Sequence, residues 1–509
     1  MSQSNHTQEP SHGTARERLS IQAGAVSLGR ILVRLSGLIG AAILSRYLTK
    51  DEYGTYRQVF LVYNTLLPLV VLGLPMSINY FIPQLPTKGA QKGFVIQTYG
   101  LLALLGLLFS LGMYILAPSL AQWFDNPSLV VLLRVFSLAP LVTLPVKFYQ
   151  QLLISLRMPR LSAGLSAALA AGRIISVIVP VVLGLPLSAV FVSVIVFFVL
   201  QSAVVGWVIF RPFRNVRKSW NPSWLREQLR YAIPLGINSV IGLLAYQIDK
   251  IMISSYFSTE QYAVYVNGAV EIPLIGILTG SIAAVLMPEM VRRYREGQPE
   301  SILRLWQASI LRVSLIILPT MVLFLLYAPQ LLTLLFSEKY AESSLFFRIY
   351  LAALPIRAAS YSTVLLALGL SRVVWRYSLA MLVTNAVLNF LLIHAIGMAG
   401  PAVATVISLY TLAFVQTRRI SRELGMSLAS TFPWRGLAMR LVAAILAGGV
   451  VLVMMLTVFS NLQWFASLLA GASAYVIAYA AIGMVLRVLT RRDLMDVFDI
   501  VLGIFRRTR

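Results

Sequence analysis

The sequence predicts an all-α polytopic membrane protein with about fourteen transmembrane helices: two six-helix lobes related by a pseudo-twofold axis along the membrane normal, plus two extra C-terminal helices. Three observations predict this fold class. The composition is 58% hydrophobic and only 12% charged, whereas a soluble protein carries about 25% charged residues. Apolar runs of about 20 residues, long enough to cross a bilayer as a helix, recur along the chain. The two halves of the sequence also repeat one another.

The composition excludes several other classes of protein. Cysteine is absent and only three histidines occur in 509 residues, which excludes disulfide scaffolds, zinc ribbons, iron–sulfur clusters and thiol catalysis. The pattern GxxxxGKS/T of an ATP-binding P-loop is missing. The net charge is +24, but in a membrane protein basic residues first report topology. We therefore expect no nucleic-acid partner and no resident cofactor.

Fourteen apolar spans follow a polar leader, which we interpret as a cytoplasmic tail rather than a cleaved signal peptide. The spans cover approximately residues 23–45, 58–82, 94–116, 129–152, 161–183, 187–210, 231–256, 262–287, 305–327, 345–368, 376–395, 401–417, 437–459 and 463–486. The predicted units are an N-terminal tail (1–22), an N-lobe (23–210), a basic cytoplasmic linker (211–230), a C-lobe (231–417), a cytoplasmic loop (418–436), two further spans (437–486) and a basic tail (487–509).

The distribution of basic residues predicts the orientation. With the N-terminus in the cytoplasm, 29 of the 42 basic residues fall in cytoplasmic segments. The outer loops then hold only Arg46, Lys50, Arg57, Lys250 and Lys339. This bias follows the positive-inside rule and predicts an even number of spans with both termini in the cytoplasm.

A twelve-residue segment at the end of the first span recurs at the end of the seventh. Residues 45–56 (SRYLTKDEYGTY) align without gaps with residues 254–265 (SSYFSTEQYAVY) at an offset of 209. A second alignment, at an offset of 212, pairs Arg173 with Asn385. Six spans separate the copies, so both cross the membrane in the same direction. Parallel repeats of this kind predict two lobes with a site between them.

The basic tail differs from the spans. Its apolar residues recur at helical spacing between pairs of arginines. This pattern predicts an amphipathic helix on the inner leaflet, and a tail folded against the cytoplasmic loops is an equal alternative.

Basic residues inside the spans need a reason, because each costs about 2.5 to 3.5 kcal/mol at membrane depth. The only acids there are Glu271 and, near an outer end, Asp249. Mutual ion pairing therefore cannot neutralise the basic set, which indicates a hydrated cavity for an anion. The basic residues are Arg30, Arg34, Arg134, Lys147, Arg173, Arg312, Arg348 and Arg357.

Arg30 and Arg34 form the strongest pair of candidates for binding a substrate. Their i,i+4 spacing places them on one face of the first helix, which continues through Gly37 and Ala41. Arg34 lies roughly 16 Å into the span, near mid-bilayer. Guanidinium groups match phosphate oxygens bidentately. The simpler alternative is that these side chains, Arg30 above all, snorkel to the cytoplasm.

Arg173 and Arg357 lie deep in their spans, and we interpret both as substrate-binding residues of the cavity. Packing against helix-end carbonyls is the competing interpretation. Asp249 and Glu271 either form structural pairs, with Lys250 or a cavity arginine, or carry a coupling proton or sodium ion. Structural pairing is the interpretation that we favour for both acids.

Three stretches resemble the multidrug/oligosaccharidyl-lipid/polysaccharide (MOP) exporter superfamily, in particular the bacterial polysaccharide-biosynthesis flippases of the O-antigen (Wzx) type. They are residues 44–56, the copy around 256–265, and 386–405, and the resemblance covers about residues 19–486. It implies two six-helix lobes that open alternately to each side of the membrane. In the lipid II flippases, first-helix arginines line a cationic cavity for a diphosphate, and Arg30 and Arg34 occupy the matching region. Ala263, where the other copy has Gly54, departs from the pattern.

The resemblance implies a flippase that moves an undecaprenyl-diphosphate-linked oligosaccharide across the bacterial inner membrane by alternating access. The expected partners are this lipid-linked oligosaccharide, membrane lipids, and a polysaccharide polymerase or other glycan-assembly protein. An ion-coupled exporter of drugs or metabolites is the main alternative. A membrane enzyme would need catalytic acids on a large outer loop, which the sequence lacks. A scaffold in a glycan-assembly complex would leave the deep arginines unexplained.

Overall fold

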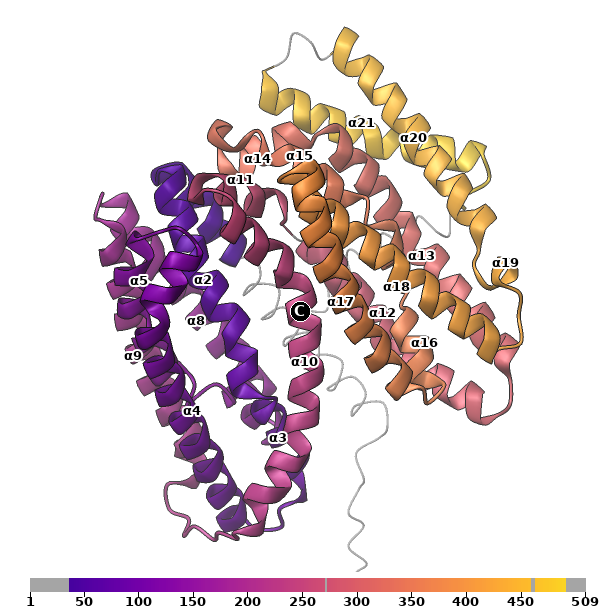
Figure 1. The fold of residues 1–509 in the computed structure, drawn as a ribbon. Helices are drawn as coiled ribbons and strands as arrows, with labels where there is room; N and C mark the ends of the chain where they lie inside the picture. The colour runs from indigo at the N-terminus through magenta and orange to yellow at the C-terminus, as the bar shows by residue number, and fades with distance from the viewer. Residues whose placement is uncertain (1–35, 271, 459–462, 491–509) are drawn as a thin grey trace, which may run out of the picture.

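The computed structural model describes residues 36–270, 272–458 and 463–490, and every regular element in those ranges is a helix (Figure 1). Residues 36–47 are helical. The first group of helices that follows comprises α2 (Lys50–Val71), α3 (Leu74–Phe81), η1 (Ile82–Gln84), α4 (Lys88–Trp123), α5 (Ser128–Phe136), α6 (Leu138–Thr143), α7 (Tyr149–Ser155), α8 (Pro159–Val182), α9 (Leu187–Phe210) and η2 (Arg211–Phe213).

The long helix α10 (Ser223–Tyr256) leads into a second group and then into two helices at the C-terminal side (Figure 1). The second group comprises α11 (Thr259–Gly268), α12 (Pro273–Arg295), α13 (Pro299–Leu326), α14 (Ala328–Phe336), η3 (Glu338–Tyr340), α15 (Ser343–Leu351), η4 (Pro355–Ala358), α16 (Tyr361–Ala367), α17 (Ser371–Ile396) and α18 (Ala399–Glu423). The short α19 (Leu428–Thr431) precedes α20 (Trp434–Thr457) and α21 (Trp464–Val485).

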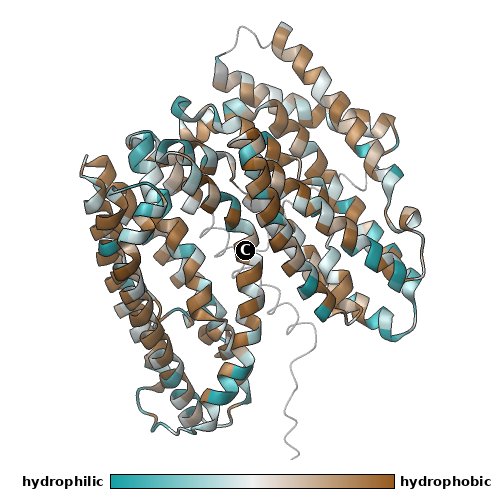
Figure 2. Cartoon of the chain, in the orientation of Figure 1, coloured by the Kyte–Doolittle hydropathy of each residue, from teal (hydrophilic) through white to brown (hydrophobic). Residues whose placement is uncertain are grey.

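The chain is a multi-pass membrane protein. Among the described residues, nine helices are long and apolar enough to span a membrane, and two bent pairs raise the number to eleven. Figure 2 shows apolar residues along the helices and hydrophilic residues mostly at their ends. The predicted all-α class is confirmed, but the count of fourteen spans is not. The first predicted span lies mostly outside the described residues, and the fourth and eighth are broken into shorter helices.

Broken helices occur at matching places in the two groups. The second span bends by 42° between α2 and α3, where Leu72 and Gly73 adopt positive φ angles of 43° and 75°. In the second group, the corresponding eighth span breaks between α11 and α12. The fourth span divides into α5, α6 and α7, and its counterpart, the tenth, into α15, η4 and α16. The repeat is therefore visible in the backbone as well as in the sequence.

The repeated twelve-residue segment forms the same local structure twice. Thr49 caps α2 through a capping box with Glu52, and Ser258 caps α11 through a capping box with Gln261. In each box the hydroxyl accepts a backbone N–H and the side chain three residues on accepts the N–H of the cap. The same spacing of these polar residues therefore starts a helix in both halves.

Helix α10 packs against both groups. Near its start, Gln228 is fully buried and donates to Ser77 Oγ on α3 (3.0 Å) and Thr98 Oγ1 on α4 (2.8 Å). A Cβ on Gly236 would collide with the backbone of Leu72. The other half of α10 packs against α11, α17 and α18 of the second group.

Helices α20 and α21 pack on each other, and α20 packs along α13. The buried Arg440 of α20 donates to the carbonyl of Leu311 and, at 3.0 Å, to Ser314 Oγ, both on α13. This arginine therefore joins the last two helices to the second group.

Candidate functional site

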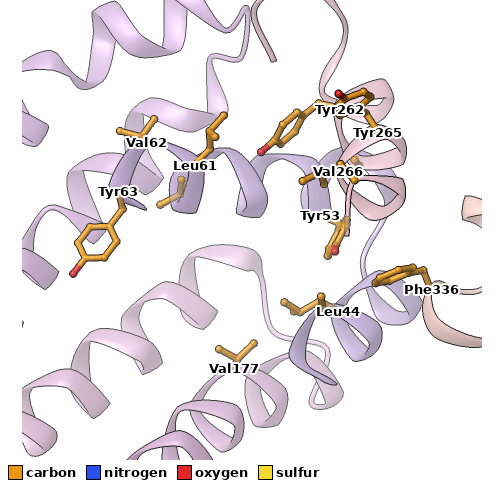
Figure 3. Close-up of a cluster of buried hydrophobic side chains, with 14 of the residues drawn as sticks. Leu44, Tyr53, Leu61, Val62, Tyr63, Val177, Tyr262, Tyr265, Val266 and Phe336 are labelled. Atoms are coloured by element: carbon orange, nitrogen blue, oxygen red, sulfur yellow. The ribbon is translucent and has the colours of Figure 1, made fainter. Parts of the chain in front are cut away.

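The two groups of helices meet where α2 and α11 begin. Tyr53 of α2 is fully buried, and its hydroxyl donates to Asn267 Oδ1 of α11 at 2.7 Å. A Cβ on Gly54 would collide with the carbonyl of Thr259, so only glycine permits this approach of the two helices. Figure 3 shows Tyr53 together with Tyr262 and Tyr265 in the buried cluster. The two copies of the repeat thus pack against each other.

Further contacts close this end of the molecule, which the sequence predicts to be the outer end. Gln58 of α2 donates to Ser254 Oγ of α10 at 2.9 Å. Arg46 donates to the carbonyl of Leu335 at 2.7 Å and to that of Leu334, both on α14. Lys339 donates back to the Arg46 carbonyl at 3.3 Å. These bonds join α2 to α10, and the helical residues 36–47 to α14 and η3.

A cavity of about 340 Å³, the central cavity, lies between the groups. It is lined from the first group by residues 36–41 and by α2, α8 and α9, and from the other side by α10 and α11. Its lining residues are Ser36, Gly37, Gly40, Ala41, Tyr56, Arg57, Phe60, Leu61, Asn64, Arg173, Ile174, Val177, Val194, Gln247, Lys250, Tyr262 and Val266.

Among the residues that the structure describes, the lining of the central cavity carries three basic side chains, from Arg57, Arg173 and Lys250, and no acidic one. Arg57 donates to Tyr53 Oη at 3.0 Å, and its guanidinium lies 5.7 Å from the centre of the Tyr53 ring. Tyr262 donates to the Arg57 backbone carbonyl at 3.4 Å. The buried tyrosines therefore hold Arg57 at the edge of the cavity without neutralising its charge.

Arg173 of α8 lines the central cavity, and its predicted role in binding substrate stays a prediction. Within the part of the chain that the structure describes, its half-buried guanidinium has no hydrogen-bond or ion-pair partner. The alternative of packing against helix-end carbonyls is not what the geometry shows. A half-buried guanidinium without a partner can bind an anion or water in the cavity.

Two predicted substrate-binding residues, Arg30 and Arg34, lie outside the described residues, as does Glu271. The described continuation of the same predicted span, through Gly37 and Ala41, lines the central cavity. The assignment of both arginines stays a prediction from the sequence.

Arg357, the fourth predicted substrate-binding residue, lies in a different place. It lines a second cavity of about 50 Å³, together with Tyr246, Asp249, Lys250 and Tyr350 among others. The Arg357 guanidinium donates to Tyr246 Oη at 2.8 Å and lies 5.7 Å from the centre of that ring. The structure therefore places Arg173 and Arg357 in separate cavities.

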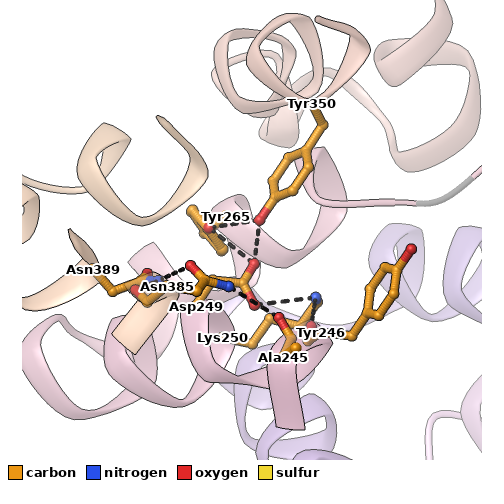
Figure 4. A network of polar contacts seen from close by, with 8 residues as sticks. All are labelled: Ala245, Tyr246, Asp249, Lys250, Tyr265, Tyr350, Asn385 and Asn389. Carbon is orange, nitrogen blue, oxygen red and sulfur yellow. Dashed lines mark hydrogen bonds and ion pairs between the residues drawn. The ribbon is translucent and has the colours of Figure 1, made fainter. Parts of the chain in front are cut away.

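Asp249 is the centre of a buried polar network (Figure 4). Its side chain is 2% exposed, and its Oδ2 accepts hydrogen bonds from Tyr265 at 3.1 Å and from Tyr350. Its Oδ1 lies 3.5 Å from Lys250 Nζ. Asp249 and Lys250 thus lie close enough to form an ion pair, and the two predicted roles of Asp249 stay predictions.

Arg57 and Lys250 are not among the predicted site residues, because their positions at the ends of spans predict both to lie in outer loops. The structure places Arg57 within α2 and Lys250 within α10, each lining the central cavity. The missed signal is the spacing of Arg57 four residues after Tyr53, which puts a cation and a phenol on one helix face. Tertiary packing decides whether a residue at the end of a span faces water or a neighbouring lobe. The local hydropathy of the sequence does not predict that packing.

The described residues contain no group of three or more His, Asp or Glu side chains that could hold a metal ion. The chemistry offered by the central cavity is binding by charge and hydrogen bonds, since arginine and lysine donate to anionic oxygens.

Three solved structures share this fold. An inward-closed lipid II flippase MurJ superposes with a TM-score of 0.70 at 12% sequence identity, covering 91% of this chain and 99% of that chain. An inward-facing multidrug resistance MATE transporter gives a TM-score of 0.64 at 16% identity over 79% and 98% of the two chains. A MOP superfamily transporter from Pyrococcus furiosus gives 0.55 at 15% identity over 80% and 95%. These proteins are transporters or flippases rather than enzymes.

Sequence comparison identifies the family. The capsular polysaccharide biosynthesis protein CapF of Staphylococcus aureus is 22% identical over 214 residues, which are 41% of this chain and 54% of CapF. The match thus spans about half the length of this curated relative. The family model for polysaccharide biosynthesis proteins matches residues 43–345, which include the first group of helices and most of the central cavity. The chain belongs to the polysaccharide biosynthesis protein family and has the fold of the MOP superfamily.

Proposed function

We propose that the protein is a flippase that moves a polyprenyl-diphosphate-linked oligosaccharide across the bacterial inner membrane through the central cavity. Membership of the polysaccharide biosynthesis family and the fold shared with a lipid II flippase support a lipid-linked cargo. The supporting observation from the structure is the charge of the cavity lining, whose described residues include three basic side chains and no acidic one.

The physical need for such a cavity follows from the cargo. Sugars and a diphosphate cannot cross hydrocarbon unaided, because burying unpaired polar or charged groups is costly. Arg57 and Arg173 would take over part of the hydration of the diphosphate while the polyprenyl chain stays in the lipid. An inside-negative membrane potential would also drive each negative charge outward by about 2.3 kcal/mol per 100 mV.

The remaining predicted residues also have roles in this proposal. Arg30 and Arg34 extend the cationic surface along the first span, and Arg357 acts from the second cavity. Asp249 serves as a structural partner of Lys250, supported by its burial and its tyrosine donors. A coupling proton or sodium ion, and contact with a glycan polymerase, are further parts of the proposal.

The competing function is an ion-coupled exporter of drugs or metabolites, which the shared fold with a multidrug transporter keeps in view. A cationic drug would need acidic groups in the cavity. The described residues that line the central cavity include no acidic group, which favours an anionic cargo.

Deletion of the protein in its host tests the proposal directly. We expect a polyprenyl-diphosphate-linked oligosaccharide to accumulate on the inner leaflet, measured by mass spectrometry of extracted lipids and by protection from an external glycosidase. Accumulation of no such lipid, together with altered drug tolerance, would instead support the exporter.

Complementation of the deletion strain then tests the residues. We expect Arg34→Ala and Arg173→Ala to insert normally and to restore little surface glycan. Arg160→Ala is a matched control, because Arg160 lies exposed on the same helix as Arg173 but outside the cavity lining. Normal surface glycan with Arg173→Ala would contradict the assigned role of the cavity.

A further inference from the structure

Lys250 is the one described residue that lines both the central cavity and the second cavity. Its side chain is 18% exposed, whereas that of its neighbour Asp249 is 2% exposed. Lys250 Nζ donates to the carbonyl of Tyr246 at 2.9 Å and lies 3.5 Å from Asp249 Oδ1 (Figure 4). The ammonium group therefore stands at the boundary between an anion-attracting space and a buried acid.

The two oxygens of Asp249 are held unequally. Oδ2 accepts hydrogen bonds from two phenols, of Tyr265 and Tyr350. Among the described residues, Oδ1 has only the Lys250 contact, at the long distance of 3.5 Å. The phenols keep the carboxylate in place if Lys250 moves away, so the ion pair can open without leaving the acid bare.

Charges on the other side of Lys250 favour such an opening once an anion enters. Arg57 and Arg173 line the same cavity and repel Lys250 when the cavity holds no anion. An anion bound between Arg57 and Arg173 would replace this repulsion of Lys250 by attraction. The anion would also offer Lys250 a second partner. Among the described residues, the titratable and charged groups around Asp249 and Lys250 are Arg57, Arg173, Tyr246, Tyr262, Tyr265, Tyr350 and Arg357.

We propose that Lys250 is an anion-responsive switch residue: an anionic group in the central cavity and the carboxylate of Asp249 compete for its ammonium group. Binding of the anion draws Lys250 from Asp249 and so reports occupancy of the central cavity to α11 and α15, which carry the two phenols. Loss of the Asp249 charge removes this competitor. It therefore strengthens binding of the anion by the factor by which the Asp249–Lys250 ion pair weakens that binding. The inference rests on the proposed function, since it requires an anionic cargo.

A double-mutant cycle with purified full-length protein in nanodiscs tests this competition. The four proteins are the wild type, Asp249→Asn, Lys250→Gln and the double variant, and the probe is farnesyl diphosphate, with farnesol as the uncharged control. We expect Asp249→Asn to tighten diphosphate binding by roughly fivefold or more. We expect Lys250→Gln to weaken it, and Asp249→Asn to have no further effect in the Lys250→Gln background.

Each other outcome has a definite meaning. The switch is overturned if Asp249→Asn changes the affinity for farnesyl diphosphate equally in the wild-type background and in the Lys250→Gln background. An unchanged affinity in Lys250→Gln also overturns it, and the cationic cavity still stands if Arg173→Gln weakens binding. Failure of the wild type to distinguish the diphosphate from farnesol contradicts the proposed function itself.

A second measurement covers the case in which Asp249→Asn does not fold. Difference infrared spectra of the wild type, with and without farnesyl diphosphate, report the environment of buried carboxylates. A shifted carboxylate band that disappears in Lys250→Gln supports the competition. A band that stays unshifted in the wild type overturns it.

Discussion

The two repeated halves of the protein share their backbone plan but differ in their charge. At equivalent positions of the repeat, α8 carries Arg173 and α17 carries Asn385. Arg173 is half-buried in the central cavity without a described partner, whereas Asn385 is fully buried and donates to the Ala245 carbonyl at 3.1 Å. At this pair of positions, the first half thus presents a charge to the central cavity, and the second half pairs a neutral polar group internally.

Features that occur in both halves of the repeat belong to the scaffold. The capping boxes and the broken helices occur in both halves, because each starts or redirects a helix. The cavity cations do not repeat. Duplicated architecture therefore places two helical groups around one site, while substitutions at equivalent positions give that site its charge.

The largest expected effect comes from making the two halves alike at the cavity. Arg173→Gln removes the unpartnered charge, and loss of a hydrogen bond to a charged group is worth about 1.5–3 kcal/mol. We expect diphosphate binding in nanodiscs to weaken by about 10- to 100-fold, measured by titration with farnesyl diphosphate. Arg160→Gln, the same change at an exposed position of α8, should leave the affinity unchanged. Equal losses in both variants would mean that overall charge, not the cavity, sets the affinity.

A smaller effect is expected where the copies of the repeat pack together. Gly54→Ala gives the first copy the residue of the second, but its Cβ would collide with the backbone of Thr259. We expect a loss of about 1–3 kcal/mol in stability, measured by thermal unfolding in detergent. The reverse change, Ala263→Gly, should cost about 1 kcal/mol through helix propensity. A Gly54→Ala variant as stable as the wild type would show that α2 and α11 do not approach so closely.

The smallest expected effect tests the part of the repeat that both halves share. Thr49→Ala and Ser258→Ala each remove a helix cap, and each should lower stability by about 1 kcal/mol. Thr49→Ser and Ser258→Thr retain the hydroxyl and are the matched controls in the same unfolding measurement. A clear loss in only one of the two alanine variants would contradict the equivalence of the two boxes.

Much of the fold could be predicted from the sequence because apolar length and repeated polar spacing are local properties. The helical class and the two copies of the twelve-residue segment belong to this part. The breaks within the fourth and eighth spans were not predicted, because an apolar run has the same hydropathy whether or not its helix is continuous. The places of Arg57 and Lys250 were missed for a related reason, since only contact between α2, α10 and α11 turns span ends into cavity walls.

Helix α10 is 34 residues long and belongs to both halves at once. Gln228 ties one end to α3 and α4, while Asn385 and Asp249 tie the other end to the second group. If the two halves tilt apart, α10 must either lose its contacts with one of them or bend along its length. Pro234, which lies between the anchorages, removes one backbone hydrogen bond from the ladder. Elastic strain from any such rocking motion would therefore concentrate near Pro234, away from the basic side chains that line the central cavity.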